Sequence, residues 1–295
     1  MPDEQFKLED YSADQLKACE SVLLELSRVL GAYWQDIALV GGWVPKLLAN
    51  DEEEPHVGTV DIDLAFNYLT IPETAYAKIH ELLVKHNYVQ NTHKAKQFQY
   101  FRTVKVGTVD RVVILDLLMG EYDQTRAKRH RHGKLQDAAP LRAKGVDMVF
   151  QHLEEIPIDG ELPDRGGKYA TKIKVASVAP IIVMKCAAME GRFKTKDSYD
   201  LYYFIKHYRG GGQAVLEELK PDIKHGSVTK ALAVIRERYQ SPEHVGPVDV
   251  AKFREIEDEA EAAVLQQDVY QTMLAFLEGV DKLLAETASL SGFDS

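Results

Sequence analysis

The chain has 295 residues, of which 45% are hydrophobic, so it can bury a sizeable core in one large domain or two ordinary ones. Its formal net charge of −10 excludes a protein that coats duplex DNA with its whole surface, although a local basic groove stays compatible with that charge. The sequence shows neither a secretory signal nor a stretch apolar enough to span a membrane. These features predict a soluble cytoplasmic protein with no membrane partner.

The first predicted element is an amphipathic helix over residues 12–31. Apolar side chains recur at helical spacing, Ser12 is the candidate N-cap and Gly31 ends the helix. Cys19 belongs to this apolar pattern and Cys186 to a later one. Because the sequence has no CxxC pair or zinc-type spacing, we expect both cysteines to be reduced core residues.

The next segments alternate between strand and helix patterns. Residues 36–42 predict a short buried strand that enters a Gly-Gly turn, and residues 43–50 predict a brief helix. Further on, strands are predicted at 60–66, 98–103 and 110–119, and a helix at 72–87. This alternation predicts a mixed α/β sheet with helices packed on it.

The last part of the chain changes to helices. Residues 145–151 and 169–177 have the β-branched, alternating character of two more strands. After them, helices are predicted at 179–191, 196–208, 212–220 and 227–239, with a long final helix over 252–286. The sequence therefore predicts a sheet domain over residues 1–178 and a helical domain over residues 179–295.

Two aspartates lie one residue apart in the predicted strand "VDIDLAF". Because residues i and i+2 of a strand share a face, Asp61 and Asp63 point the same way while Ile62 points to the other side. Like charges so close together are destabilising unless something compensates them. Mg²⁺ or Mn²⁺ would do so, because hard cations bind several oxygen ligands at once and can bridge carboxylates to phosphates.

Two further features fit the same chemistry. Asp116 lies in the apolar strand "VVILDLLM" and needs a partner, which is either the same metal ion or an interior arginine such as Arg102 or Arg111. The Gly41-Gly42 turn lets backbone N–H groups approach a triphosphate closely, although it is also compatible with a plain turn. Together the features indicate metal-assisted nucleotidyl transfer.

Residues 37–118 resemble the nucleotidyltransferase superfamily, which includes DNA polymerase β. Its pattern is a Gly-Gly or Gly-Ser turn, then a DxD strand, then a third strand carboxylate. The resemblance implies a nucleotidyltransferase-fold mixed sheet followed by a C-terminal helical unit that completes the active site. It also implies that Gly41 and Gly42 bind nucleotide and that Asp61, Asp63 and Asp116 are catalytic metal ligands.

The segment "IIVMKCAAMEGRFKTKDSYDLYYFI" is similar to the nucleotidyl transferase AbiEii/AbiGii toxin family and its MenT-type relatives. In that family a helical lysine is followed by an arginine and by an RD or KD pair, two residues, and D-L. The resemblance implies catalytic roles for Lys185 and Asp200, and nucleotide binding by a basic and acidic set: Lys185, Arg192, Lys196 and Asp197.

The same residues also have a simple physical reading. Lys185 lies on an apolar helix, so its ammonium must reach towards an anion, for which a nucleotide phosphate is one candidate. Asp197 and Asp200 share a helix face and can either hold lysine and arginine side chains in place or accept a proton from the attacking hydroxyl. Alternatively, the segment is only a capped, solvated helix start with Asp197 as the cap.

Two charged loops complete the pattern. Residues 125–134, "TRAKRHRHGK", are either a solvated loop or a loop that tracks the phosphates of an RNA or an NTP. Residues 47–59, "LLANDEEEPHVGT", make a longer and more acidic connection than the superfamily pattern has, and we expect this acidic rim to repel a polyanion.

The leading hypothesis is an enzyme that uses Mg²⁺ or Mn²⁺ to move NMP from an NTP to an acceptor hydroxyl. The resemblance implies an AbiEii-type toxin of a toxin–antitoxin or phage-defence system, with an RNA acceptor such as the 3′ end of tRNA and a cognate antitoxin as partner. One alternative is a transferase that modifies a small molecule such as an antibiotic. Another is a non-catalytic module of the same fold that binds a protein.

Overall fold

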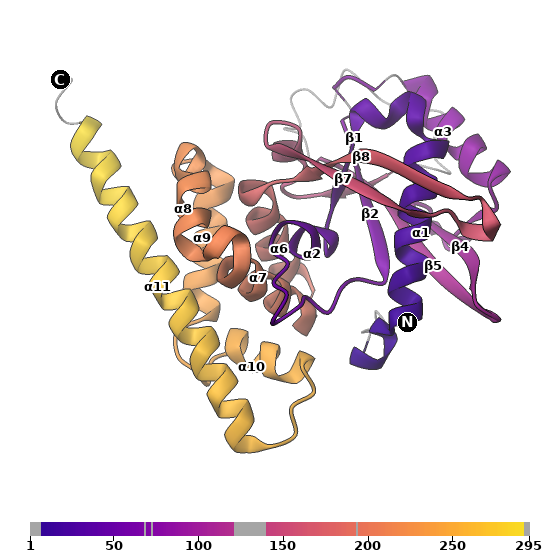
Figure 1. Ribbon diagram of the computed structural model, residues 1–295. Helices are drawn as coiled ribbons and strands as arrows, with labels where there is room; N and C mark the ends of the chain where they lie inside the picture. Colours follow the sequence, from indigo (N-terminus) through magenta and orange to yellow (C-terminus); the bar gives the residue numbers. More distant parts are fainter. Residues whose placement is uncertain (1–6, 68, 72, 121–139, 193, 292–295) are drawn as a thin grey trace. The chain divides into compact units, whose positions relative to one another are not determined.

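The computed structural model describes residues 7–67, 69–71, 73–120, 140–192 and 194–291 (Figure 1). The chain forms two compact units. We call Glu9–Val44 with Gly58–Pro180 the sheet unit, and Met1–Leu8, Pro45–Val57 and Ile181–Ser295 the helical unit. The sequence-based boundary at residue 178 did not anticipate that the segment between the Gly-Gly turn and the DxD strand belongs with the helical unit.

The sheet unit contains, within the described residues, one eight-stranded mixed sheet of order β3-β4-β5-β2-β1-β8-β7, with β6 paired to β5. The strands are β1 (Ile37–Val40), β2 (Asp61–Phe66), β3 (Tyr88–Gln90), β4 (Gln99–Val106), β5 (Val109–Gly120), β6 (Leu141–Ala143), β7 (Leu153–Glu161) and β8 (Lys168–Ala176). The pairs β2/β5, β1/β8 and β5/β6 are parallel. The remaining pairs are antiparallel.

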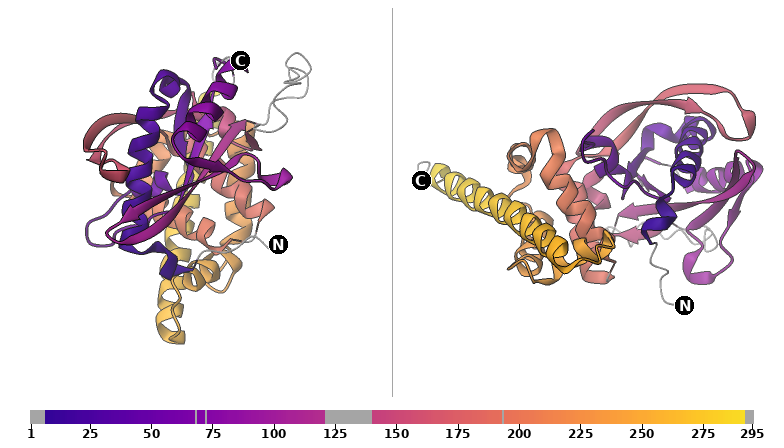
Figure 2. Two further views of the ribbon diagram at one scale, coloured as in Figure 1. Left: turned by 90° about the vertical axis from the view of Figure 1, so that its right-hand side faces the viewer. Right: turned by 60° about the horizontal axis from the view of Figure 1, so that its bottom comes forward.

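Helix α1 (Ala13–Val29) packs against β4, β5 and β7 and lies across one face of the sheet (Figure 2). Its start is as predicted, because Ser12 Oγ accepts a hydrogen bond from the Gln15 backbone N–H. Helix α3 (Glu73–Lys85) connects β2 to β3. On this side of the sheet the buried pair of Glu25 and Arg102 joins α1 to β4 at 3.0 Å.

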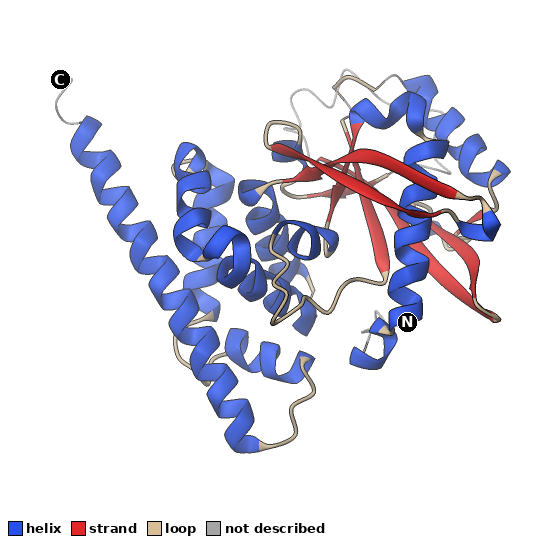
Figure 3. Cartoon of the chain, in the orientation of Figure 1, coloured by secondary structure: helices blue, strands red, loops and turns tan. Residues whose placement is uncertain are grey.

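The helical unit consists of helices and their connections throughout its described residues (Figure 3). Its elements are α7 (Thr195–His207), α8 (Gly212–Leu219), α9 (Gly226–Arg238), α10 (Val245–Phe253) and α11 (Glu259–Ser291), with most of α6 (Val178–Gly191) and of α2 (Trp43–Leu48). Helix α10 packs on α7 and α11, and α11 also packs on α8. The predicted mixed α/β sheet followed by a C-terminal helical unit is confirmed.

Two element predictions were wrong. Residues 145–151 do not form a strand: Gly145 adopts a left-handed conformation with φ of 87°, and a short helix, α5 (Val146–Val149), follows it. The predicted final helix is also interrupted. Helix α10 ends at Phe253, Glu255 has a positive φ of 51°, and Asp258 Oδ1 accepts the Glu261 N–H at the start of α11.

Both cysteines are buried, and neither forms a disulfide within the described residues, as expected. Among the described residues, no helix is both long enough and apolar enough to cross a lipid bilayer.

Candidate active site

Three aspartates share one face of the sheet. Strands β2 and β5 are parallel neighbours, and their register sets Asp63 opposite Asp116 and Asp61 opposite Ile114. Because side chains alternate along a strand, Asp61, Asp63 and Asp116 all lie on the same face. The opposite face carries the fully buried Ile62. The carboxylates therefore lie on the side of the sheet that α1 does not cover.

Neutral donors orient two of these carboxylates. Thr59 Oγ1, which is buried, donates to Asp61 Oδ1 at 2.5 Å, and Gln99 Nε2 donates to Asp116 Oδ1 at 3.0 Å from the adjoining strand β4. The indole N–H of Trp43 donates to the backbone oxygen of Asp61 at 2.9 Å. A hydroxyl or an amide fixes a carboxylate without cancelling its charge.

The predicted interior arginines are paired elsewhere. Arg102 donates to Glu25 and, at 2.6 Å, to Asp164, while the Arg111 guanidinium lies 3.6 Å from Asp14. Both guanidinium groups thus contact other carboxylates.

The glycine turn lies against this carboxylate face. Gly41 has φ of +71°, a left-handed conformation that favours glycine, and a Cβ at this position would overlap the carboxylate of Asp63. The helix that follows, α2, offers few donors to an anion. It has only six residues, Val44 N–H is bonded to Gly41 O, and Pro45 has no N–H. The backbone N–H groups at the turn itself are therefore the relevant donors.

The chemistry of this donor set fits a hard divalent cation, because three carboxylates lie on neighbouring positions of one sheet face. In the described parts of the chain, no three His, Cys, Asp or Glu side chains are gathered closely enough to hold a metal ion as they stand. Binding would thus require rotation of the aspartate side chains about a backbone that already holds them side by side.

A second cluster of charged residues lies in the helical unit, on α6 and α7. Lys185 Nζ is 2.5 Å from Asp200 Oδ2 and 3.1 Å from Asp197 Oδ1. Arg192 Nε lies 3.0 Å from Asp197 Oδ2, and Lys196 Nζ lies 2.7 Å from Asp200 Oδ1. The helix N-cap is Lys194, so Asp197 is not the cap that one interpretation proposed. We refer to Lys185, Arg192, Lys196, Asp197 and Asp200 as the ion-pair cluster.

Two opposing effects set the pKa values of Lys185 and Asp200. Burial disfavours the charged form of each side chain, and the oppositely charged neighbours favour it more strongly. The pKa of Lys185 is raised above its ordinary value, because Asp200 and Asp197 overcome the effect of desolvation. The pKa of Asp200 is lowered against desolvation by Lys185 and Lys196. Since the Asp200 side chain is 0% exposed and held by these cations, it is a poor proton acceptor and a good anchor.

His56, which sequence reasoning missed, completes the surroundings of Asp200. Its Nε2 lies 3.1 Å from Asp200 Oδ1, and its ring stacks on Tyr199 and meets Tyr203 edge-on. Burial lowers the pKa of His56 to about 4, although Asp200 pulls in the opposite direction. The neutral ring therefore carries its hydrogen on Nε2, and this N–H donates a hydrogen bond to the Asp200 carboxylate. No spacing in the sequence indicates a contact across 144 residues.

The acidic loop is less repulsive than its sequence suggests. Within the helical unit, Glu54 Oε2 lies 3.1 Å from Lys206 Nζ and 3.4 Å from His207 Nε2. Asp51 accepts the N–H groups of Glu53 and Glu54 and lies 3.6 Å from His207 Nδ1. The Lys206 ammonium on α7 thus balances part of the negative charge of the predicted acidic rim. The basic run at residues 125–134 lies outside the described residues.

Known proteins offer a distant structural likeness to this chain. No protein-family model matches the chain, and no curated protein matches it. Among solved structures, the chain is similar to an antigenic nucleotidyltransferase-like protein from Paracoccidioides brasiliensis, with 16% identity over 86% of this chain and 94% of that chain, at a TM-score of 0.41. A likeness at that level carries no argument about activity, so the function has to be argued from the residues.

Proposed function

We propose that the chain is a metal-dependent nucleotidyltransferase that moves NMP from an NTP to an acceptor hydroxyl. The observation that carries the proposal is the arrangement of Asp61, Asp63 and Asp116 on one sheet face beside a glycine that no other residue could replace without overlap. In the reaction, the acceptor oxygen forms a bond to the α-phosphorus while the bond to the β-phosphate oxygen breaks. Pyrophosphate leaves with the oxygen that bridged the α- and β-phosphorus atoms, and the proton of the acceptor hydroxyl passes to solvent water.

Asp61, Asp63 and Asp116 would hold Mg²⁺ or Mn²⁺, which, when bound, neutralises charge on the phosphates. Thr59 and Gln99 keep two of these carboxylates oriented through neutral hydrogen bonds. Gly41 and Gly42 provide backbone N–H groups without side chains, so a triphosphate can approach the turn closely. Each of these roles belongs to a residue of the sheet unit.

We propose two different roles for the residues of the ion-pair cluster. Lys196 and Arg192 have side chains that are 16% and 47% exposed, so they can reach a phosphate while keeping contact with their aspartates. Lys185, Asp197 and Asp200 are almost completely buried and would position them. In this view Asp200 acts through Lys196 and not on the substrate, which differs from the direct role favoured by the sequence resemblance.

The acceptor is the finer part of the proposal. We infer a toxin of the AbiEii type acting on an RNA 3′ end, with a cognate antitoxin, because α6 and α7 carry the lysine, arginine, KD and D-L residues that resemble that family. The ion pair of Glu54 with Lys206 supports this choice over a cationic drug, since it balances part of the negative charge of the acidic loop.

The test is to incubate the protein with each α-labelled NTP, Mg²⁺ or Mn²⁺, and either total RNA or an aminoglycoside. Labelled RNA supports the toxin, and label on the aminoglycoside alone supports the small-molecule alternative. Asp61→Asn and Asp63→Asn should each lower transfer by about 10²- to 10³-fold or more.

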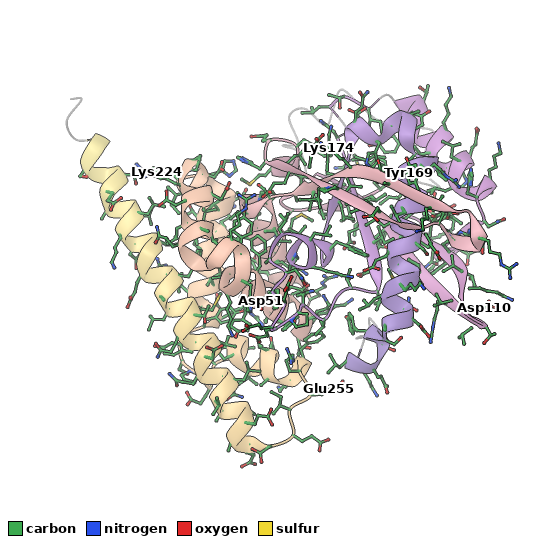
Figure 4. All side chains as sticks on the ribbon, in the orientation of Figure 1. Asp51, Asp110, Tyr169, Lys174, Lys224 and Glu255 are labelled. Carbon is green, nitrogen blue, oxygen red and sulfur yellow. The ribbon has the colours of Figure 1, made fainter. Side chains whose placement is uncertain are left out.

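The matched control is Asp110→Asn. Asp110 lies on β5 with the same alternation as Asp116, but at the exposed tip of the β4–β5 hairpin (Figure 4), so its substitution should leave transfer unchanged. Absence of labelling with every NTP and acceptor would point to a non-catalytic module. Equal losses in all three variants would contradict the assignment of the carboxylate face.

A further inference from the structure

A chain of hydrogen bonds leads from the protein backbone to Asp116. The His93 backbone N–H donates to Asn91 Oδ1 at 3.0 Å. Asn91 Nδ2 donates to Gln99 Oε1 at 2.9 Å, and Gln99 Nε2 donates to Asp116 Oδ1 at 3.0 Å. Gln99 is opposite Asp116 in the register of β4 and β5, and Asn91 N–H bonds to Gln99 O just beyond the end of β3. The side chains therefore lie in one row across neighbouring strands.

The direction of every bond in this row is set at one end. A backbone N–H can only donate, so Asn91 must present its oxygen to His93 and its NH₂ group to Gln99. Gln99 must then present its oxygen to Asn91 and its NH₂ group to Asp116. If either amide were reversed, two oxygens would face each other. The backbone at His93 thus decides that a donor, and not an acceptor, meets the carboxylate.

We infer that Asn91 and Gln99 form a relay that positions Asp116 for binding the divalent cation. This inference rests on the proposed function, since it assigns a purpose to the orientation of a proposed metal ligand. Carboxylates that bind metals are themselves held by hydrogen bonds, and the loss of such partners weakens metal binding substantially. An amide suits the task because it restricts the carboxylate without adding positive charge, whereas a lysine at the same place would compete with the metal.

The experiment measures Mn²⁺ binding to the full chain by electron paramagnetic resonance, with thermal unfolding of each variant recorded in parallel. Gln99→Leu removes the donor to Asp116 and should raise the Kd for Mn²⁺ about tenfold or more. Asn91→Asp keeps the acceptor for His93 but replaces the NH₂ group by an oxygen. Gln99 then lies between two carboxylates that can only accept, so its NH₂ group is divided between them and no longer held towards Asp116. Mn²⁺ should again bind more weakly.

Asn91→Asp separates the relay from simple electrostatics, because an added negative charge near the site would by itself strengthen Mn²⁺ binding. The matched control is Gln90→Leu: Gln90 lies on β3 and donates to the Gln97 backbone oxygen at 2.7 Å, so it supports the same hairpin without belonging to the relay. We expect its Mn²⁺ affinity to stay within twofold of wild type.

Several outcomes would overturn the relay while leaving the metal site intact: wild-type affinity in Gln99→Leu, tighter binding in Asn91→Asp, or a loss in Gln90→Leu equal to that in Gln99→Leu. Failure of the wild-type protein to bind Mn²⁺ would instead overturn the metal site itself, and the relay's purpose with it.

Discussion

The two groups of aspartates in this chain solve the same physical problem in different ways. In the ion-pair cluster, Asp197 and Asp200 are buried only three residues apart on α7, and lysine and arginine side chains contact both of them. On the sheet face, Thr59 and Gln99 donate to Asp61 and Asp116. Both of these donors are neutral groups.

The proposed function assigns the two groups different uses. A carboxylate that is closed off by the protein's own cations stabilises and positions its partners, because removal of either side leaves a buried charge uncompensated. A carboxylate held by neutral donors keeps its affinity for a cation that arrives from solution. The sequence presents both groups as pairs of aspartates at short spacing, and only the contacts in the structure distinguish them.

The largest expected effect is at Asp200 in the ion-pair cluster. Asp200→Asn removes the negative charge facing Lys185 and Lys196, and we expect a loss of about 3–5 kcal/mol in the free energy of unfolding, as for other broken buried ion pairs. Urea denaturation followed by far-ultraviolet circular dichroism measures this loss. The matched variant Asp281→Asn breaks the exposed pair with Arg236 and should cost at most about 1 kcal/mol.

Equal stability of the two variants would contradict the structural role. If Asp200→Asn kept wild-type stability but lost all transfer activity, Asp200 would have to act directly on the substrate, as the sequence resemblance implies.

Acidification tests the surroundings of Asp200, because its neighbour His56 titrates at an unusually low pH. Its folded pKa is about 4, below its ordinary value of 6.5, so the unfolded chain takes up a proton first as the pH falls. Above pH 6.5 the ring is neutral in both states, and the shift costs no stability. As the pH falls from 6.5 towards 4, the free energy of unfolding decreases by up to about 3 kcal/mol, because only the unfolded state is protonated.

The measurement is the urea midpoint of wild type and of His56→Gln between pH 7 and pH 4.5. The glutamine keeps a donor for Asp200 but does not titrate. The difference in urea midpoint between wild type and His56→Gln should therefore narrow or reverse as the solution becomes more acidic. A difference that stays constant over this range would contradict the assigned pKa shift.

Local sequence patterns predicted much of the fold. The helix over 12–31, the strands at 36–42, 60–66 and 110–119, and the run of C-terminal helices were predicted from periodicity and glycine positions, and the structure contains all of them. The failures have local causes. At 145–151 the β-branched residues were weighed above a left-handed glycine, and in the final helix an uninterrupted helical pattern hid the break at Glu255 (Figure 4).

The candidate site was predictable only where its residues lie close in sequence. Alternation along one strand places Asp61 and Asp63 together, but the contact of Asp116 with Gln99 depends on the register of β4 and β5. His56 reaches Asp200 because a segment from the first part of the chain belongs to the helical unit. Such long-range pairings leave no periodic signal, and an isolated amide or histidine in a loop has no distinctive pattern.

The smallest expected effect concerns Gly41, which has a positive φ and lies against the carboxylate of Asp63. Gly41→Ala and Gly167→Ala both place a side chain at a positive φ, which costs about 1–2 kcal/mol of stability at each position. A Cβ at Gly167 meets nothing within 4 Å, whereas at Gly41 it overlaps the carboxylate of Asp63. Gly167→Ala should therefore lose stability alone, and Gly41→Ala should lose similar or greater stability together with Mn²⁺ affinity. Equal Mn²⁺ affinity in the two variants would mean that the glycine turn is only a turn, because displacement of Asp63 is the one consequence that separates them.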